Sequence, residues 1–242
     1  MFSSFRLRLI PFVATVLVAA LGILAGQWQS GRAEQKQQIE KAMAAQTAAE
    51  PLRLSAKTSP SDATEYRRVV LTGEFVSEWK LYLENRPQQG VAGFHVLTPF
   101  RLSDSDRHVL VARGWLPRNP MNRTELPKFG TPEGNVTIEG RVRHNPGKVM
   151  QLGDDIPIAP EAFIQNITVQ RFEQAARLDM LPFLVEQTSE TNDGLARAWT
   201  VPSTGIDKHR GYAFQWYGLA LMAVVFFIVT GFKRGTDNNG AR

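Results

Sequence analysis

The chain has 242 residues, a formal net charge of +5 and no cysteine. The ends outside Ser30–Gly211 hold five basic residues and one acidic residue, which leaves 23 Lys and Arg against 22 Asp and Glu in the central stretch. This near balance excludes nucleic-acid binding through a basic surface. The lack of cysteine excludes disulfides, thiol-based copper or redox sites and cysteine-linked haem.

Leu7–Gln27 is the first of two apolar segments, and it predicts a transmembrane helix over residues 7–28. About 20 residues are needed to cross a hydrocarbon core roughly 30 Å thick. A cleaved signal peptide is the alternative. It is disfavoured because the apolar core exceeds the usual range of about 7–15 residues and Gln27-Trp28-Gln29 is a poor cleavage site.

Residues 30–50 predict a helical stalk after the first span. Arg32–Ala49 is rich in Ala, Gln, Glu and Lys, which favour helices, and Pro51 ends the segment. Residues 51–206 then predict one exported domain, which begins with a Ser- and Pro-containing loop.

That domain is predicted to be mainly antiparallel β, in a compact sheet or open barrel, with one or two short helices. β-branched and aromatic segments bounded by turn residues predict strands at Arg68–Phe75, Lys80–Asn85, Phe94–Leu102, His108–Leu116 and Val136–His144. In the fourth of these, alternation places Val109, Val111 and Arg113 on one face and Leu110, Ala112 and Gly114 on the other.

The last part of the domain predicts one helix and one more strand. Thr168–Leu178 has an apolar face at helical spacing and Thr168 as a possible N-cap. Leu184–Thr188 predicts a strand, and Asp193-Gly194 predicts a turn.

Phe214–Phe232 is the second apolar segment, and it predicts a transmembrane helix over residues 212–232 with a cytoplasmic tail at 233–242. Lys and Arg near a span favour the cytoplasmic side, and they stand at Arg6, Arg8 and Lys233-Arg234. Both termini are therefore expected in the cytoplasm. The central domain is expected outside, in the periplasm of a Gram-negative bacterium, and the fold class is membrane-anchored α+β.

The common catalytic motifs are missing. The sequence has no GxxxxGK[ST], HExxH, GxSxG or GxGxxG, so the corresponding enzyme classes find no support. Of the four histidines, His95, His108 and His144 fall in or beside predicted strands and are interpreted as ordinary hydrogen-bonded side chains. His209 differs because it stands just before the second span.

Aromatic and amide residues gather at the outer ends of both spans. Antiparallel pairing brings Gln27-Trp28 near Gln215-Trp216, and Gly22 and Gly26 permit a close approach of the two helices.

In a helix that begins at Asp207, one face carries His209, either Tyr212 or Ala213, and Trp216. Two interpretations are open for this face. One is an interfacial aromatic belt, and the other is a site for a flat, lipophilic cofactor with an imidazole ligand.

Four segments along the chain form an ordered series. They are LGxxAGxWQxxR at Leu21–Arg32, a GxxVxTPF-like segment at Gly93–Phe100, a VLVNRGWVP-like segment at Val109–Pro117 and an NxHxxYAxQWY-like segment at Asp207–Tyr217. The series resembles the surfeit locus protein (Shy) family of cytochrome c oxidase assembly factors. Ala112 and Asp207 depart from the family's pattern, where Asn is usual.

The resemblance implies maturation of subunit I of an aa3-type oxidase, with haem a bound by bacterial members. It implies His209 as the haem iron ligand, with Tyr212, Trp216 and Trp28 as cofactor-binding neighbours. Arg113, Gly114, Trp115 and Gln215 are further motif positions. For Arg113, a structural ion pair is favoured over contact with a haem propionate.

The expected partners are subunit I or its assembly intermediate, haem A synthase and membrane lipid, with the chain in the bacterial inner membrane. Three functions stay open. The leading one is a non-enzymatic factor that delivers or protects haem a. The others are a docking scaffold that never contacts haem and, remotely, a membrane-tethered periplasmic enzyme.

Overall fold

The computed structural model describes residues 7–122, 125–144, 147, 149–150, 156–199 and 205–236. The chain divides into two compact units. The helical unit comprises Met1–Ala42 and Pro202–Arg242, and the β unit comprises Met43–Val201.

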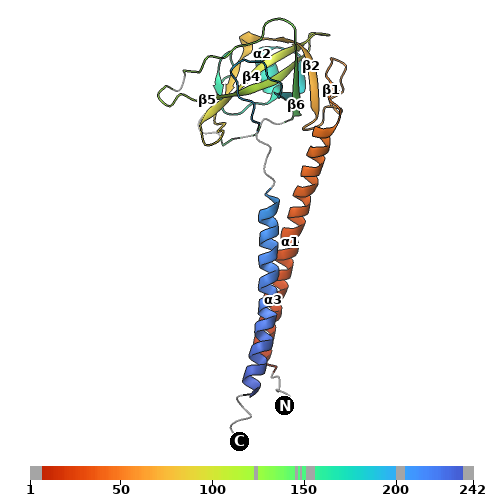
Figure 1. Ribbon diagram of the computed structural model, residues 1–242, viewed down its shortest axis with the longest axis vertical. Coiled ribbons are helices and arrows are strands. Elements are labelled where there is room, and N and C mark those ends of the chain that lie inside the picture. Colours follow the sequence, from red (N-terminus) through yellow and green to blue (C-terminus); the bar gives the residue numbers. More distant parts are fainter. Residues whose placement is uncertain are drawn as a thin grey trace. The chain divides into compact units, whose positions relative to one another are not determined.

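The helical unit is built from α1 (Leu9–Ala48) and α3 (Ile206–Thr236), which run side by side (Figure 1). Both helices are long and apolar enough to cross a membrane. The predicted first span and stalk lie in one continuous helix, and the predicted second span lies within α3. Residues 237–242 of the predicted tail are outside the described residues.

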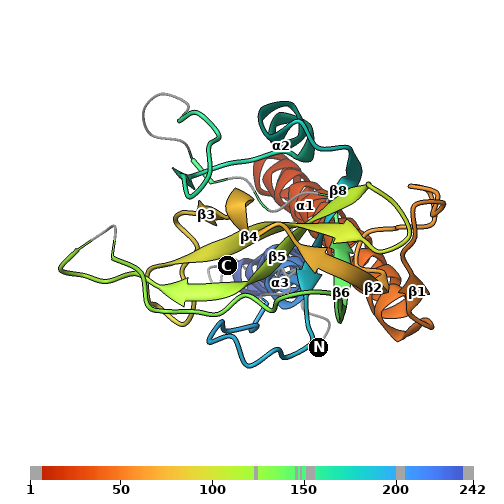
Figure 2. The same cartoon turned by 90° about the horizontal axis from the view of Figure 1, so that it is seen from above.

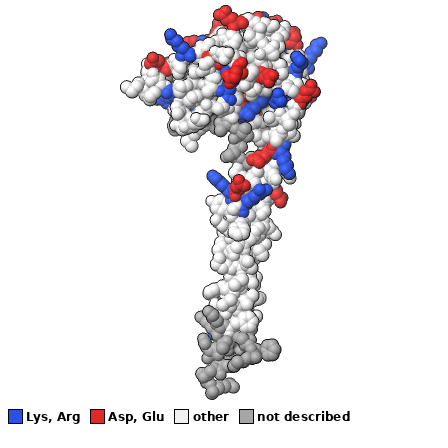
Figure 3. Space-filling model, in the orientation of Figure 1, with Lys and Arg blue, Asp and Glu red and all other residues white. Residues whose placement is uncertain are grey.

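Charge is confined to the ends of these helices. Between Arg8 and Arg32 in α1, and between Arg210 and Lys233 in α3, the sequence has no charged residue. Figure 3 shows the result as a long uncharged band on the visible face of the helix pair. Such a band suits a hydrocarbon core, where isolated charges are costly.

Two glycines let the helices approach closely. A Cβ atom added at Gly22 would lie 2.9 Å from Ala220 Cβ and 2.9 Å from the Trp216 carbonyl oxygen. A Cβ added at Gly26 would lie 2.5 Å from the Tyr217 ring. The helices therefore pack antiparallel with both glycines in the interface, which confirms the close approach predicted from the sequence.

The β unit contains eight strands and two short helices. They are β1 (Leu52–Arg53), β2 (Arg68–Phe75), η1 (Ser77–Trp79), β3 (Leu81–Leu83), β4 (Gly93–Leu102), β5 (His108–Pro117), β6 (Val136–Arg143), β7 (Phe163–Ile164), α2 (Val169–Ala176) and β8 (Met180–Gln187). The five strands predicted up to Val136–His144 are found with shifts of at most two residues. β8 begins four residues before the predicted strand. The extra residues include Pro182, and a proline in a sequence argues against a strand.

The sheet order is β1-β2-β6-β8-β5-β4-β3-β7, with an additional pairing of β2 with β4. That pairing closes β2, β6, β8, β5 and β4 into a ring. The β unit is therefore a closed barrel, whereas the sequence predicted a compact sheet or an open barrel. Most pairs are antiparallel, as predicted, but β1 with β2, β3 with β7 and β5 with β8 pair in parallel. Figure 2 shows α2 beside β8 at one side of the sheet.

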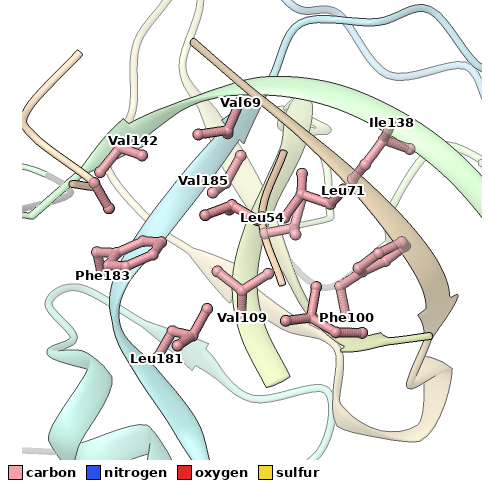
Figure 4. Close-up of a cluster of buried hydrophobic side chains, with 13 residues drawn as sticks. Leu54, Val69, Leu71, Phe100, Val109, Ile138, Val142, Leu181, Phe183 and Val185 are labelled. Atoms are coloured by element: carbon pink, nitrogen blue, oxygen red, sulfur yellow. The ribbon is translucent and has the colours of Figure 1, made fainter. Parts of the chain in front are cut away.

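The core of the ring is formed by alternate residues of its five strands. Figure 4 shows this cluster, which includes Val69, Leu71, Phe100, Val109, Ile138, Val142, Phe183 and Val185. A second cluster contains Leu110, Ala112 and Phe172 of α2, on the outer face of β5. The predicted alternation along β5 is therefore confirmed from Val109 to Ala112, with both faces buried, and the pairing of β5 with β4 shifts register beyond Ala112. Thr168 caps α2 by accepting a hydrogen bond from the Arg171 backbone N–H, as predicted.

Candidate functional site

His209 lies in the first turn of α3 and is half-buried against α1. Its Nδ1 atom is 2.7 Å from Oε1 of Gln29. An amide oxygen can only accept a hydrogen bond, so Nδ1 is the donor in this contact, and in a neutral imidazole Nε2 then carries the lone pair. This is the protonation state in which an imidazole binds a metal through Nε2.

A groove of about 400 Å³ runs along one flank of the helix pair. It is lined by Ser30, Ala33, Glu34 and Gln37 of α1 and by Arg210, Ala213, Phe214 and Tyr217 of α3. Arg210 Nη2 donates a hydrogen bond to Gln37 Oε1 across the groove at 3.2 Å. Among these lining residues, none belongs to the site predicted from the sequence, which consists of His209, Tyr212, Trp216 and Trp28.

The predicted aromatic residues lie on the other flank. Successive helix residues are about 100° apart, so Trp28 and Ser30 leave α1 on opposite sides of the face that meets α3. By the same geometry, Tyr212 and Arg210 leave α3 on opposite sides of its contact face. Trp28 and Tyr212 therefore share the flank away from the groove, where they are 59% and 51% exposed.

Trp216 and Arg32 extend this flank. Trp216 follows His209 by seven residues, which places the two on one face of α3, and it is 39% exposed. The guanidinium carbon of Arg32 lies 5.9 Å from the Trp28 ring centroid. The flank thus combines an oriented imidazole, exposed aromatic rings and a cation. Gln215 is exposed on α3, and it is Gln29 that meets His209.

Arg113 belongs to the β unit, where it is fully buried on β5. Its Nη2 atom donates to Asp193 Oδ2 at 2.8 Å and to the Gly130 carbonyl at 2.7 Å, and Nη1 donates to Thr131 Oγ1 at 2.7 Å. Its guanidinium carbon lies 4.7 Å from the centroid of the Phe75 ring. Both terminal nitrogens are therefore engaged by the protein, and Arg113 makes the favoured structural ion pair.

Asp193 joins two arginines in this network. Its Oδ2 atom also accepts a hydrogen bond from Arg197 Nη2 at 2.6 Å and from Thr191 Oγ1 at 2.9 Å. Burial alone would raise the pKa of Asp193, but the hydrogen bonds from Arg197, the Leu195 N–H and Thr191 hold it below its usual value. Burial lowers the pKa of Arg113, and the charge of Asp193 opposes that shift.

Gly114 and Trp115 of β5 contact the loop after β8, which also carries Asp193. A Cβ added at Gly114 would lie 2.7 Å from Leu195 Cβ and 2.9 Å from the Ala196 carbonyl oxygen. Trp115 exchanges backbone hydrogen bonds with Ala196, and its indole Nε1 donates to the Arg86 carbonyl at 2.6 Å. Within the β unit, the Arg113-Gly114-Trp115 segment therefore has a packing role.

The remaining histidines lie apart from one another in the β unit. His144 Nε2 is 2.9 Å from the Ala63 carbonyl oxygen, and the His95 ring packs edge-on against Trp199. His108 is buried on β5, and its Nδ1 has no hydrogen-bond partner among the described atoms. The described part of the chain holds no cluster of three or more His, Cys, Asp or Glu that could bind a metal ion.

The sequence does not indicate the contacts of two residues in these sites. Gln29 stands out in it only as part of the Trp28-Gln29 motif, and Asp193 only as a turn residue. A signal existed for each. A buried arginine requires an acceptor, and a histidine at a helix interface requires a partner for its second nitrogen.

Comparison with known proteins gives consistent matches. The SURF1 family matches residues 16–221. A SURF1-like protein of Monosiga brevicollis is 28% identical over 244 residues, which cover 94% of this chain and 89% of the relative. A SURF1-like protein of Rickettsia bellii is 24% identical over 238 residues, which cover 93% and 92%. Cytochrome oxidase assembly protein SHY1 of Saccharomyces cerevisiae is 32% identical over 93 residues, which cover 38% of this chain and 24% of that protein.

Proposed function

This chain belongs to the SURF1 family, and from that premise we propose that it is an assembly factor for cytochrome c oxidase. The name of the yeast relative, a cytochrome oxidase assembly protein, supports this role, although that similarity covers a minority of both chains. The missing catalytic motifs agree with a non-enzymatic factor. Its partner is then an assembly intermediate of the oxidase, through subunit I.

Deletion of the gene tests the assembly role. A delivery or protection factor accelerates a step that proceeds slowly without it, so the deletion strain retains some assembled oxidase. We expect less haem a per subunit I and lower oxidase activity, while unrelated quinol oxidases stay intact. Normal haem a content in the deletion strain, under conditions that express the oxidase, would contradict the role.

The finer proposal is that the cargo is haem a, held at the flank that carries Trp28 and Tyr212. The observation that supports it is the His209–Gln29 hydrogen bond, in which Nδ1 donates and the neutral imidazole keeps Nε2 for a metal. Such an imidazole is a common ligand of haem iron.

The surroundings of His209 also fit a haem. Exposed aromatic rings at Trp28, Tyr212 and Trp216 offer apolar contact to a macrocycle, and Arg32 offers a cation to its propionates. Arg113 has no such role in this proposal, because both of its terminal nitrogens are already engaged. Haem A synthase is the proposed donor of the cargo.

The proposed setting is the bacterial inner membrane, with both termini in the cytoplasm and the β unit in the periplasm. The antiparallel packing of α1 and α3 supports a two-span hairpin, and the flanking Lys and Arg support its direction. Reporter fusions at Ser105 and at Gly240, which lies outside the described residues, should report opposite compartments. Equal behaviour at both points would refute the hairpin.

An absorption spectrum separates the haem factor from a docking scaffold. The protein is purified in several detergents from cells that make haem A. A haem factor should carry a haem a spectrum at a substantial ratio of haem to protein. A ratio near zero in all detergents would support the scaffold, which holds an assembly intermediate without contacting haem.

A further inference from the structure

We infer that Gln29 is a positioning residue that sets the tautomer and ring orientation of His209 for an iron ligand. The inference rests on the proposed haem role and adds a residue from the other helix to it. The observation that carries it is the 2.7 Å contact between Gln29 Oε1 and His209 Nδ1, which joins residues 180 positions apart.

The packing of the helix pair holds this contact in place. Gly22 and Gly26 bring α1 within contact of Ala220 and Tyr217, and Gln29 follows Gly22 and Gly26 on the same face of α1. Next along that face, Ala33 is buried, at 5% exposure. Gln29 therefore faces α3, because Gly22 and Gly26 before it and Ala33 after it lie on the same face of α1.

The hydrogen bond has a chemical consequence for Nε2. A histidine that binds a metal usually donates its other ring N–H to an acceptor, which fixes the tautomer and raises the basicity of the ligating nitrogen. Gln29 Oε1 supplies that acceptor here. Without it, the His209 ring would be free to rotate about its side-chain bonds and to place its proton on Nε2.

A purely structural role for Gln29 makes a different prediction. Hydrogen bonds between transmembrane helices can contribute to packing alone. In that case a Gln29 variant would alter helix association but leave the electronic properties of bound iron unchanged. The iron–histidine vibration and the reduction potential of the haem therefore separate positioning from packing.

The experiment uses the full chain in detergent, titrated with haem a. Gln29→Leu removes the acceptor, and we expect haem affinity to fall about 10- to 100-fold, as for other partners of metal ligands. The iron–histidine stretching frequency should fall and the potential of the remaining bound haem should rise. Gln29→Glu keeps an acceptor and adds charge, so it should retain haem and lower the potential below that of the wild type.

Gln27→Leu is the matched control, since Gln27 is an exposed glutamine two residues away on α1. It should leave affinity, vibration and potential unchanged. If the wild type binds haem and Gln29→Leu matches it in all three measurements, the inference is wrong while the haem role stands. If the wild type binds no haem, the proposed haem role and this inference are both overturned.

Discussion

The guanidinium of Arg113 and the carboxylate of Asp193 form an ion pair of 2.8 Å, although 80 residues separate them in the chain. Their side chains are 0% and 1% exposed. The pair ties β5 to the loop that follows β8, and Gly114 and Trp115 contact the same loop. The Arg113-Gly114-Trp115 segment is thus explained by packing within the β unit.

Removal of Asp193 should therefore destabilise the β unit strongly. Asp193→Ala leaves Arg113 and Arg197 buried without their shared carboxylate, and we expect a loss of about 3–5 kcal/mol in the free energy of unfolding. Denaturant unfolding of the full chain in detergent, followed by tryptophan fluorescence, measures this. The control is Glu74→Ala, which breaks an equally short ion pair with Arg101 that is half exposed. It should cost about 0–1 kcal/mol, and equal losses in the two variants would contradict the argument.

Packing of α1 on α3 should depend on Gly26. A leucine there would overlap the Tyr217 ring, and overpacking of this kind costs about 1–3 kcal/mol. Because the chain has no cysteine, the helix contact can be followed by a disulfide between cysteines at Ala33 and Ala213, two buried alanines that line the same groove.

Gly26→Leu should reduce the yield of that cross-link. Gly31→Leu is the matched control, since a Cβ at Gly31 meets no atom within 4 Å, and it should leave the yield unchanged. A wild-type yield in the Gly26→Leu protein would show that the helices do not pack through this glycine.

The stability of the β unit should fall in mild acid. Burial, together with the charges of Arg86 and Arg143, lowers the pKa of His95 to about 4. In the unfolded chain its pKa is about 6.5, so between these values the unfolded state binds the proton and the folded state does not. The stabilisation by neutral His95 is therefore fully present above pH 6.5 and is lost as the pH falls toward 4. It amounts to something on the order of 3 kcal/mol.

Free energies of unfolding at pH 7 and pH 4.5 test this for the wild type and His95→Gln. The wild type should lose more stability than the variant. Burial also lowers the pKa of His108, which acts in the same direction but is present in both proteins. The difference between the two losses therefore isolates His95, and identical losses would show that His95 is not the responsible group.

Local signals in the sequence were sufficient for much of the fold. The alternation of Val109 to Ala112 and the cap at Thr168 act through neighbours a few residues away, and the four-residue spacing of Gly22 and Gly26 is a local pattern, although their contacts lie on α3. Such patterns are readable because a strand or helix repeats them.

Contacts between distant segments were not readable in this way. Closure of the ring through β2 and β4 depends on the register of Gly73 with Leu102. Asp193 has the chemistry of a turn residue in the sequence, and only the fold brings Arg113 to it. Gln29 is an ordinary interfacial amide until α3 places His209 against it. Each of these depends on tertiary structure that a single sequence does not encode locally.

The central proposal is that His209 binds the iron of haem a, and the most direct measurement is the haem content of His209→Ala purified from cells that make haem A. The variant should lose most of its co-purified haem while protein level and membrane insertion stay normal, because it removes one hydrogen bond but leaves the long apolar helices and their glycine contacts intact. His95→Ala and His144→Ala, which alter histidines of the β unit, should keep their haem. A His209→Ala protein with the wild-type haem spectrum would contradict the account, and the aromatic residues around His209 would then be an interfacial belt.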